Sequence, residues 1–244
     1  MDLKIEDVAE LLNLSENTIE NWLSEGKIPS YQINGQIRFN RLEIEDWMMH
    51  QKLEPAVYAA GACQVNAKSN AGSGHFSLYR ALNKGGILYD VEGSSKEEVI
   101  RNTVKHIAFL HDLDEEVITE LLLDRERLMP TALNNGFAIP HAREFLLDTH
   151  FDIVALAFPK DVIEYGALDG KPVHTLFFLF ATDDKRHLQI LAKIAHLISD
   201  PVAVDLLRLQ TDKEGILEFI KDWENSLHSH IHPFEPSYSH KVGK

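Results

Sequence analysis

The chain has 244 residues, of which 44% are hydrophobic and 25% charged, and its formal net charge is -14 at pH 7. These values are typical of a globular protein with one large or two small domains, and they exclude a disordered or fibrous chain. The acidic balance argues against general affinity for nucleic acid or for an anionic membrane surface, so any contact with DNA must be local.

Disulfides, membrane spans and a secretory leader find no support in the sequence. The single cysteine, Cys63, excludes an intrachain disulfide and a cysteine-based metal cluster. The longest apolar run, Leu176 to Ala181, is too short to span a bilayer, and residues 1–7 contain no long apolar core. We therefore expect a cytoplasmic protein without membrane insertion.

The first 52 residues begin with the pattern of two short helices. Apolar residues at helical spacing start at Ile5, and Asn13-Leu14 makes a turn. Ser15 can then cap a second helix, which stops at Gly26. This order predicts a helix-turn-helix.

A hairpin and a third helix follow. Residues 31–39 alternate around Asn34-Gly35, which is a strong signal for a two-residue hairpin, and residues 40–43 form a capping-box-like start of a last helix. The order resembles the small winged helix-turn-helix domain of the MerR/excisionase group. The resemblance covers nearly all of residues 3–50, and its matching positions are Val8-Ala9-Glu10-Leu11-Leu12, Ser15, Thr18, Gly26-Lys27-Ile28-Pro29, Gly35 and Arg38-Phe39.

A helix-turn-helix domain reads DNA with its second helix, while basic side chains neutralise phosphates. The candidate DNA contacts are Asn17, Thr18 and Asn21 on that helix, with Lys27, Arg38 and Arg41 toward the wing. However, Glu16, Glu20 and Glu25 occupy positions where members of the group often carry Arg or Lys. Two interpretations stay open: weak or assisted DNA binding, or contact with a protein, including a second copy of this chain in a homo-oligomer.

Composition divides the chain into four parts. Residues 59–77 are mostly Ala, Gly and Ser without amphipathic period, which is typical of a flexible tether. We therefore predict a helix-turn-helix domain over 1–52, a flexible linker over 53–77, a second domain over 78–227 and a loose tail over 228–244. The tail carries several histidines, but such flexible ends bind metals weakly and unspecifically, so no metal site is predicted.

The second domain has the alternating helices and strands of an α/β fold. Capping signals at Ser95 and Asp114 precede helical segments, and runs rich in Val, Leu and Phe predict buried strands. The predicted helices are 95–110, 114–126 and 186–199, one after 200–201, and 213–223, and the predicted strands are 152–158 and 174–181. Such alternation implies helices packed on a sheet.

Residues 136–141 (GFAIPH) deliver one histidine at the end of an apolar, strand-like run. Gly136 allows close approach of backbone or of a partner, and Pro140 contributes no N–H to a strand ladder, so the strand should stop there. We expect His141 to face a cleft instead of lying inside the sheet. An imidazole is neutral near pH 7 and can act as a nucleophile.

Residues 131–141 resemble the phosphorylation-site signature of enzyme IIA domains of the bacterial phosphotransferase system, in the mannitol/fructose/nitrogen-regulatory class. The resemblance implies an α/β domain of type 2, with a mixed sheet flanked by helices, in which His141 accepts a phosphoryl group through Nε2. Segments 121–126 and 183–191 also match the family, and they supply Arg125 and His187 to the site. The same resemblance places Thr131, Asn135 and Gly136 in a phosphate loop, although Ala132 and Asn134 stand where the family usually has glycines.

The resemblance also implies partners and a role. The donor is the phosphohistidine of HPr or of its nitrogen-branch relative, and no cofactor or metal is implied. Fusion to a helix-turn-helix domain favours a regulatory protein that acts on DNA or on regulatory target proteins. The alternative is a component of a sugar-transport relay that passes phosphate to a IIB protein, while a DNA-binding repressor with an inactive second domain is disfavoured because Arg125, His141 and His187 are all present.

Overall fold

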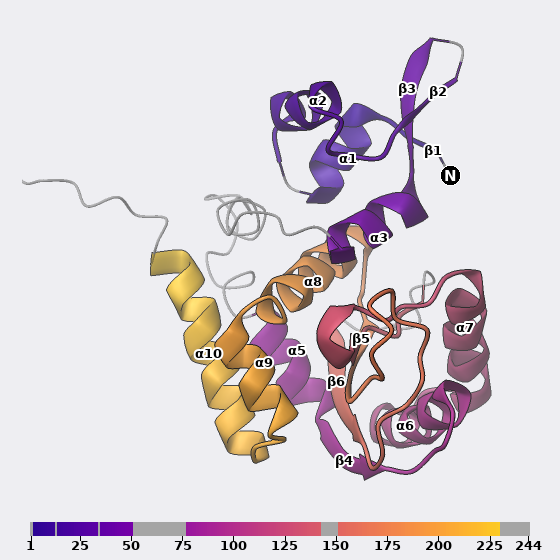
Figure 1. Cartoon of the computed structure of the whole chain (residues 1–244), viewed down its shortest axis with the longest axis vertical. Helices are drawn as coiled ribbons and strands as arrows, with labels where there is room; N and C mark the ends of the chain where they lie inside the picture. The colour runs from indigo at the N-terminus through magenta and orange to yellow at the C-terminus, as the bar shows by residue number, and fades with distance from the viewer. Residues whose placement is uncertain (1, 13, 34, 51–76, 143–150, 230–244) are drawn as a thin grey trace, which may run out of the picture.

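The computed structural model describes residues 2–12, 14–33, 35–50, 77–142 and 151–229 (Figure 1). Of the predicted linker over 53–77, only residue 77 is described, so Cys63 lies outside the described residues. Of the predicted tail over 228–244, only residues 228–229, at the end of the last helix, are described. No helix in the described part of the chain combines the length and apolar character needed to cross a bilayer.

The front domain is a helix-turn-helix with a small sheet. Its elements are β1 (Asp2–Leu3), α1 (Ile5–Leu12), α2 (Glu16–Ser24), β2 (Tyr31–Ile33), β3 (Gln36–Asn40) and α3 (Arg41–His50). Ser15 caps α2 by accepting a hydrogen bond from the Thr18 amide, as its position predicted. The antiparallel pairing of β2 with β3 brings Ile33 opposite Gln36, so the predicted hairpin is confirmed.

The second domain contains four strands and six α-helices among the residues that the structure describes. The elements are α5 (Ser77–Gly85), β4 (Ile87–Val91), α6 (Lys96–His111), α7 (Glu115–Leu128), β5 (Phe137–Ala138), β6 (Ile153–Pro159), β7 (Thr175–Phe180), α8 (Asp184–Leu197), α9 (Pro201–Arg208) and α10 (Lys213–Ser229). Ser95, Asp114, Asp183 and Asp200 cap helices through their side chains. The sequence predicted these caps at Ser95 and Asp114, but α5 and β4 were not identified.

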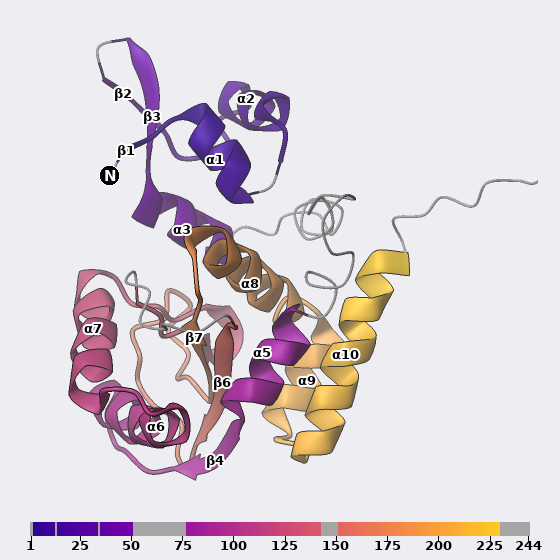
Figure 2. The same cartoon turned by 180° about the vertical axis from the view of Figure 1, so that it is seen from behind.

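The sheet is mixed, as predicted, with the order β4-β6-β7-β5. β4 and β6 are parallel, β6 and β7 antiparallel, and β7 and β5 parallel. Side chains alternate along β6, so that Ile153, Ala155 and Ala157 join one apolar cluster with α6 and α7, while Val154, Leu156 and Phe158 join another with α5, α8, α9 and α10. The two groups of helices therefore cover opposite faces of the sheet (Figures 1 and 2).

The end of α5 depends on a glycine. A Cβ atom added at Gly85 would lie 2.3 Å from the carbonyl oxygen of Val154, so only glycine allows α5 to approach β6 this closely. The close approach fixes α5 on the face of the sheet that also carries α8.

The front domain packs on the second domain through α8. Both α1 and α3 contact α8, and the apolar core of the front domain is continuous with the cluster that contains α8. Figures 1 and 2 show α3 lying beside the start of α8. An ion pair between Arg41 of α3 and Asp184 of α8 joins the two domains. The front domain therefore packs on one end of the second domain.

A buried ion pair stabilises the helical layer behind the sheet. Lys193 Nζ lies 2.5 Å from Glu224 Oε1, and Glu224 accepts hydrogen bonds from the amides of Leu78 and Tyr79 at the start of α5. We expect Glu224→Gln to lower the free energy of unfolding by about 3–5 kcal/mol, because it removes the carboxylate charge that pairs with the buried Lys193 ammonium group.

Urea unfolding measures this loss. The matched control is Glu120→Gln, which breaks an exposed pair with Arg101 and should cost less than about 1 kcal/mol. Equal losses for the two variants would show that the buried pair does not stabilise this layer.

Candidate active site

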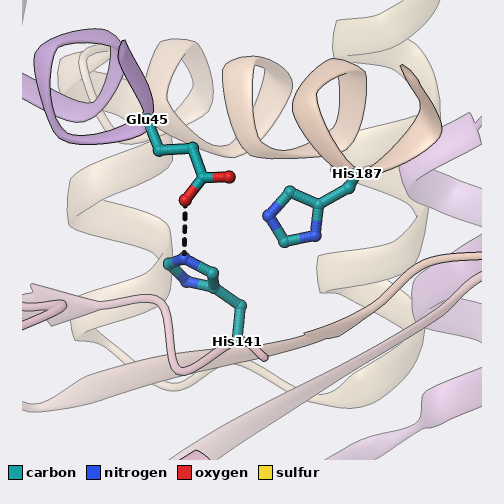
Figure 3. Close-up of side chains that lie close together, drawn as sticks. All are labelled: Glu45, His141 and His187. Atoms are coloured by element: carbon teal, nitrogen blue, oxygen red, sulfur yellow. Dashed lines mark ion pairs between the residues drawn. The ribbon is translucent and has the colours of Figure 1, made fainter. Parts of the chain in front are cut away.

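His141 follows β5 and continues its alignment with β7. The Leu179 amide donates to the Pro140 carbonyl at 3.0 Å, and His141 forms an isolated parallel bridge with Leu179. The strand itself ends at Ala138, before Pro140 as predicted. The backbone of His141 is therefore fixed by the sheet, whereas its side chain projects from the sheet edge toward α3 and α8 (Figure 3).

The hydrogen bond of the His141 ring defines its tautomer. Nδ1 lies 2.7 Å from the Ile139 carbonyl oxygen, which can only accept, so Nδ1 carries a hydrogen. In the neutral ring the lone pair is then on Nε2. Nε2 is buried and has no hydrogen-bond partner among the described residues. Nε2 is therefore the ring nitrogen of His141 that is available to react.

His187 lies in the first turn of α8 and faces the same space. The centroids of the His141 and His187 rings are 5.1 Å apart, and the His187 side chain is buried. Burial lowers the pKa of His187 to about 3, and the nearby positive charges of Arg41 and Arg125 act in the same direction. His187 is therefore neutral near pH 7, so the short distance between the two rings does not bring two positive charges together.

Glu45 completes this cluster from the front domain. Its Oε2 atom lies 3.8 Å from Nε2 of His141 (Figure 3). Its Oε1 atom accepts a hydrogen bond from Arg41 Nε at 2.9 Å. Burial alone would raise the pKa of Glu45, but its interactions with the His141 ring and the hydrogen bond from Arg41 outweigh burial and hold that pKa well below its ordinary value.

The position of Glu45 corrects one expectation. The sequence predicted that His141 faces a cleft, but His141 is 1% exposed because α3 covers it. Sequence reasoning missed Glu45 because it lies 96 positions before His141 in another domain. The available signal was a carboxylate flanked by the apolar residues Ile44, Trp47 and Met48, which are buried as well.

Arg125 lies near the end of α7 and is buried. One guanidinium nitrogen, Nη1, donates to the Met129 carbonyl at 2.8 Å. Since its charge contributes to the low pKa of His187, Arg125 lies within electrostatic range of the histidine pair. Three separated segments of the chain therefore contribute a buried histidine pair and a buried arginine within electrostatic range of it.

The predicted phosphate-loop residues do not all lie beside His141. Thr131 is buried, and its hydroxyl donates to Glu126 Oε2 at 2.6 Å. Asn135 and Gly136 lie at the other end of β5 from His141: the Asn135 amide donates to Asp169, and a Cβ at Gly136 would lie 2.5 Å from the ring of His174. The structure does not bring Asn135 and Gly136 together with His141, because β5 runs between them.

The candidate DNA contacts also divide into two groups. Asn17, Asn21 and Lys27 are exposed, and Thr18 bonds to Ser15, which holds the first turn of α2. Arg38 donates to Gln36 and to the Ile37 carbonyl on β3. Arg41 differs from the others, because its guanidinium pairs with Glu45 and Asp184 at the contact between the domains.

A mixed α/β domain with an N-terminal helix-turn-helix is therefore the class of protein that the fold defines. Residues 80–223 match the model of the family described as "Phosphoenolpyruvate-dependent sugar phosphotransferase system, EIIA 2". Residues 3–52 match a model described as "Helix-turn-helix domain". The chain belongs to the enzyme IIA type 2 family of the phosphotransferase system, and membership of this family implies phosphotransfer between proteins.

Several relatives of the chain are nitrogen regulatory proteins. The Nitrogen regulatory protein of Pseudomonas aeruginosa is 32% identical over 151 residues, which cover 61% of this chain and 97% of the relative. The protein of the same name from Escherichia coli is 30% identical over 153 residues, covering 61% and 92%. The crystal structure of the nitrogen regulatory protein IIA-Ntr from Neisseria meningitidis matches with a TM-score of 0.53 and 26% identity, covering 59% of this chain and 98% of that one. The chain is thus similar to the regulatory members of the system.

Proposed function

We propose that this protein is a regulatory phosphotransferase-system protein that accepts a phosphoryl group on Nε2 of His141 from an HPr-type carrier. The observation that carries the proposal is the buried pair of His141 and His187, in which the Nδ1 hydrogen of His141 bonds to Ile139 and leaves Nε2 as the nucleophile. Similarity to nitrogen regulatory proteins favours the nitrogen-branch relative of HPr as the donor.

The transfer balances without a cofactor. The phosphorus–nitrogen bond of the carrier's phosphohistidine breaks as the lone pair of His141 Nε2 forms a new bond to phosphorus, and the carrier's imidazole leaves. The Ile139 carbonyl holds the hydrogen on Nδ1 and stabilises positive charge that develops on the ring. The Arg125 guanidinium and the ring of His187 are the groups that would stabilise the charge on the phosphoryl oxygens.

The position of α3 connects this reaction to the front domain. A carrier must bring its phosphorus within bonding range of Nε2, but the His141 side chain is fully buried beneath α3 in this structure. Transfer therefore requires α3 to move away. Once attached, a phosphoryl dianion lies where Glu45 now approaches within 3.8 Å, and the two negative charges repel. Phosphorylation would thus keep the helix-turn-helix domain released, and the predicted linker over 53–77 would tether it.

The test of this function combines two measurements on the full chain. The protein is incubated with phosphorylated carrier and the label is located by peptide mapping, and genomic DNA capture is then compared with and without the phosphoryl group. We expect the label on His141 and a change in capture. Equal capture in both states would remove the switch, while transfer of the label to a IIB protein would favour the sugar-transport alternative.

Salt dependence distinguishes the two possible outputs of the front domain. If Lys27 and Arg38 contact DNA phosphates, affinity should fall steeply as salt rises, with a slope in log–log form of about -0.9 per phosphate neutralised. Lys27→Ala should therefore reduce the slope by about 1, whereas Lys171→Ala, an exposed lysine of the second domain, should not. A slope near zero would indicate that the domain contacts protein instead.

A further inference from the structure

Three ligand-type atoms meet in one buried space between the two domains. The donor atoms of Glu45, His141 and His187 all lie within 4.8 Å of one another. Each side chain is at least nine-tenths buried, with exposures of 1%, 1% and 3%. Figure 3 shows the carboxylate and both imidazoles directed toward a common point, from α3, the segment after β5, and α8.

These three atoms are not satisfied by hydrogen bonds within the described part of the chain. Glu45 Oε2, His141 Nε2 and His187 Nε2 are buried without a partner there. Nε2 of His141 and Oε2 of Glu45 lie 3.8 Å apart, which is too long for a hydrogen bond, so neither atom satisfies the other. A single divalent cation in this space would satisfy all three atoms.

We propose that the unphosphorylated protein binds a divalent transition-metal ion, with Zn²⁺ the best fit, through Glu45, His141 and His187. Two imidazoles and one carboxylate are a ligand set typical of zinc sites with an open fourth position. Ligand bonds of about 2.0–2.2 Å in a tetrahedron place the donor atoms roughly 3.3–3.6 Å apart. The observed separations of 3.8 Å to at most 4.8 Å need only small side-chain shifts.

Outer contacts already orient two of the ligands. The Ile139 carbonyl fixes the Nδ1–H tautomer of His141, which leaves Nε2 for the metal, and Arg41 holds Oε1 of Glu45 so that Oε2 faces the histidines. Hydrogen bonds of this kind orient metal ligands and tune their basicity. The site is incomplete in either domain alone, because Glu45 comes from α3 and both histidines come from the second domain.

The metal would act as a bridge between the domains. It holds α3 over the site, and it uses the lone pair of His141 Nε2 that a phosphoryl group would need. Metal binding and phosphorylation therefore exclude each other. Binding itself does not depend on the proposed function, whereas this competition rests on it.

The experiment measures Zn²⁺ binding by competition with a chromogenic chelator, using the metal-stripped full chain. To remove the contribution of the histidine-rich end, all proteins carry alanine at His228, His230, His232 and His240. We expect one Zn²⁺ per chain, weakened at least about tenfold by Glu45→Gln and by His187→Gln. The control Glu43→Gln, on an exposed position of α3, should bind as tightly as the parent. Circular dichroism checks that each variant is folded.

Two results would overturn the metal site: no stoichiometric binding once the terminal histidines are replaced, or equal affinity in the Glu45→Gln and Glu43→Gln variants. A second measurement adds Zn²⁺ during labelling by phosphorylated carrier. Zn²⁺ should block labelling of the parent at concentrations that leave Glu45→Gln labelled. Absence of labelling in metal-free protein would contradict the proposed function but not the site, whereas labelling at full occupancy by Zn²⁺ would contradict the competition.

Discussion

Substitution of His141 by alanine is expected to abolish labelling by phosphorylated carrier. The substitution removes the nucleophilic Nε2 atom itself, so no slower route through the same site remains. The neighbouring His187 is a weaker nucleophile, because burial lowers its pKa to about 3. The measurement is the initial rate of label uptake by the full chain.

Two further variants are measured beside His141→Ala for comparison. His106→Ala changes an exposed histidine of α6 and should keep the rate of the parent protein. Arg125→Ala keeps the acceptor but loses a buried charge near the site, and its rate should fall by about 10²-fold or more. Undiminished labelling of His141→Ala would show that another residue accepts the phosphoryl group.

Weakening the contact between α3 and the second domain is expected to accelerate labelling. Arg41→Ala removes the ion pairs with Glu45 and Asp184 and leaves the buried Glu45 carboxylate with less compensation. The cost to the closed arrangement, in which Glu45 lies against His141, is about 1–3 kcal/mol. This corresponds to a roughly 5- to 150-fold change in the equilibrium between closed and open forms. Where opening limits access to His141, the rate of labelling should rise by up to that factor.

The control for Arg41→Ala is Glu43→Gln on the exposed side of α3, which should leave the rate unchanged. Hydrogen exchange of the amides in α3 and α8 gives an independent reading. Exchange in α3 should be faster in Arg41→Ala than in the parent, and faster in the phosphorylated protein than in the unphosphorylated one. Unchanged labelling together with equal exchange would mean that α3 does not restrict access to His141.

Much of the fold could be predicted because it depends on local patterns. The caps at Ser15, Ser95 and Asp114 lie next to the helices that they start, and the hairpin of β2 and β3 is signalled by Asn34-Gly35 between the strands. By contrast, α5 was missed because it directly follows a segment without amphipathic period. The five residues of β4 carry no capping or turn pattern as strong as these.

The site was predictable only in part, because sequence patterns identify segments and not the distances between residues in the folded chain. Arg125, His141 and His187 belong to segments that each resemble the family, so three separate matches point to one site. Asn135 and Gly136 share a segment with His141, yet β5 separates them from it. Proximity in sequence was therefore a poor guide to proximity at the end of a strand.

The sequence by itself determined the two domains, their classes and the histidine that the site is built around, because capping, periodicity and family motifs act within short segments. Only the tertiary structure decided that α3 lies over His141 and that Glu45 enters the site. That contact joins residues 96 positions apart, and it depends on how α1 and α3 pack on α8. No pattern within a short segment of the sequence predicts such packing, because it arises from apolar surfaces and charges that meet only when both domains are folded.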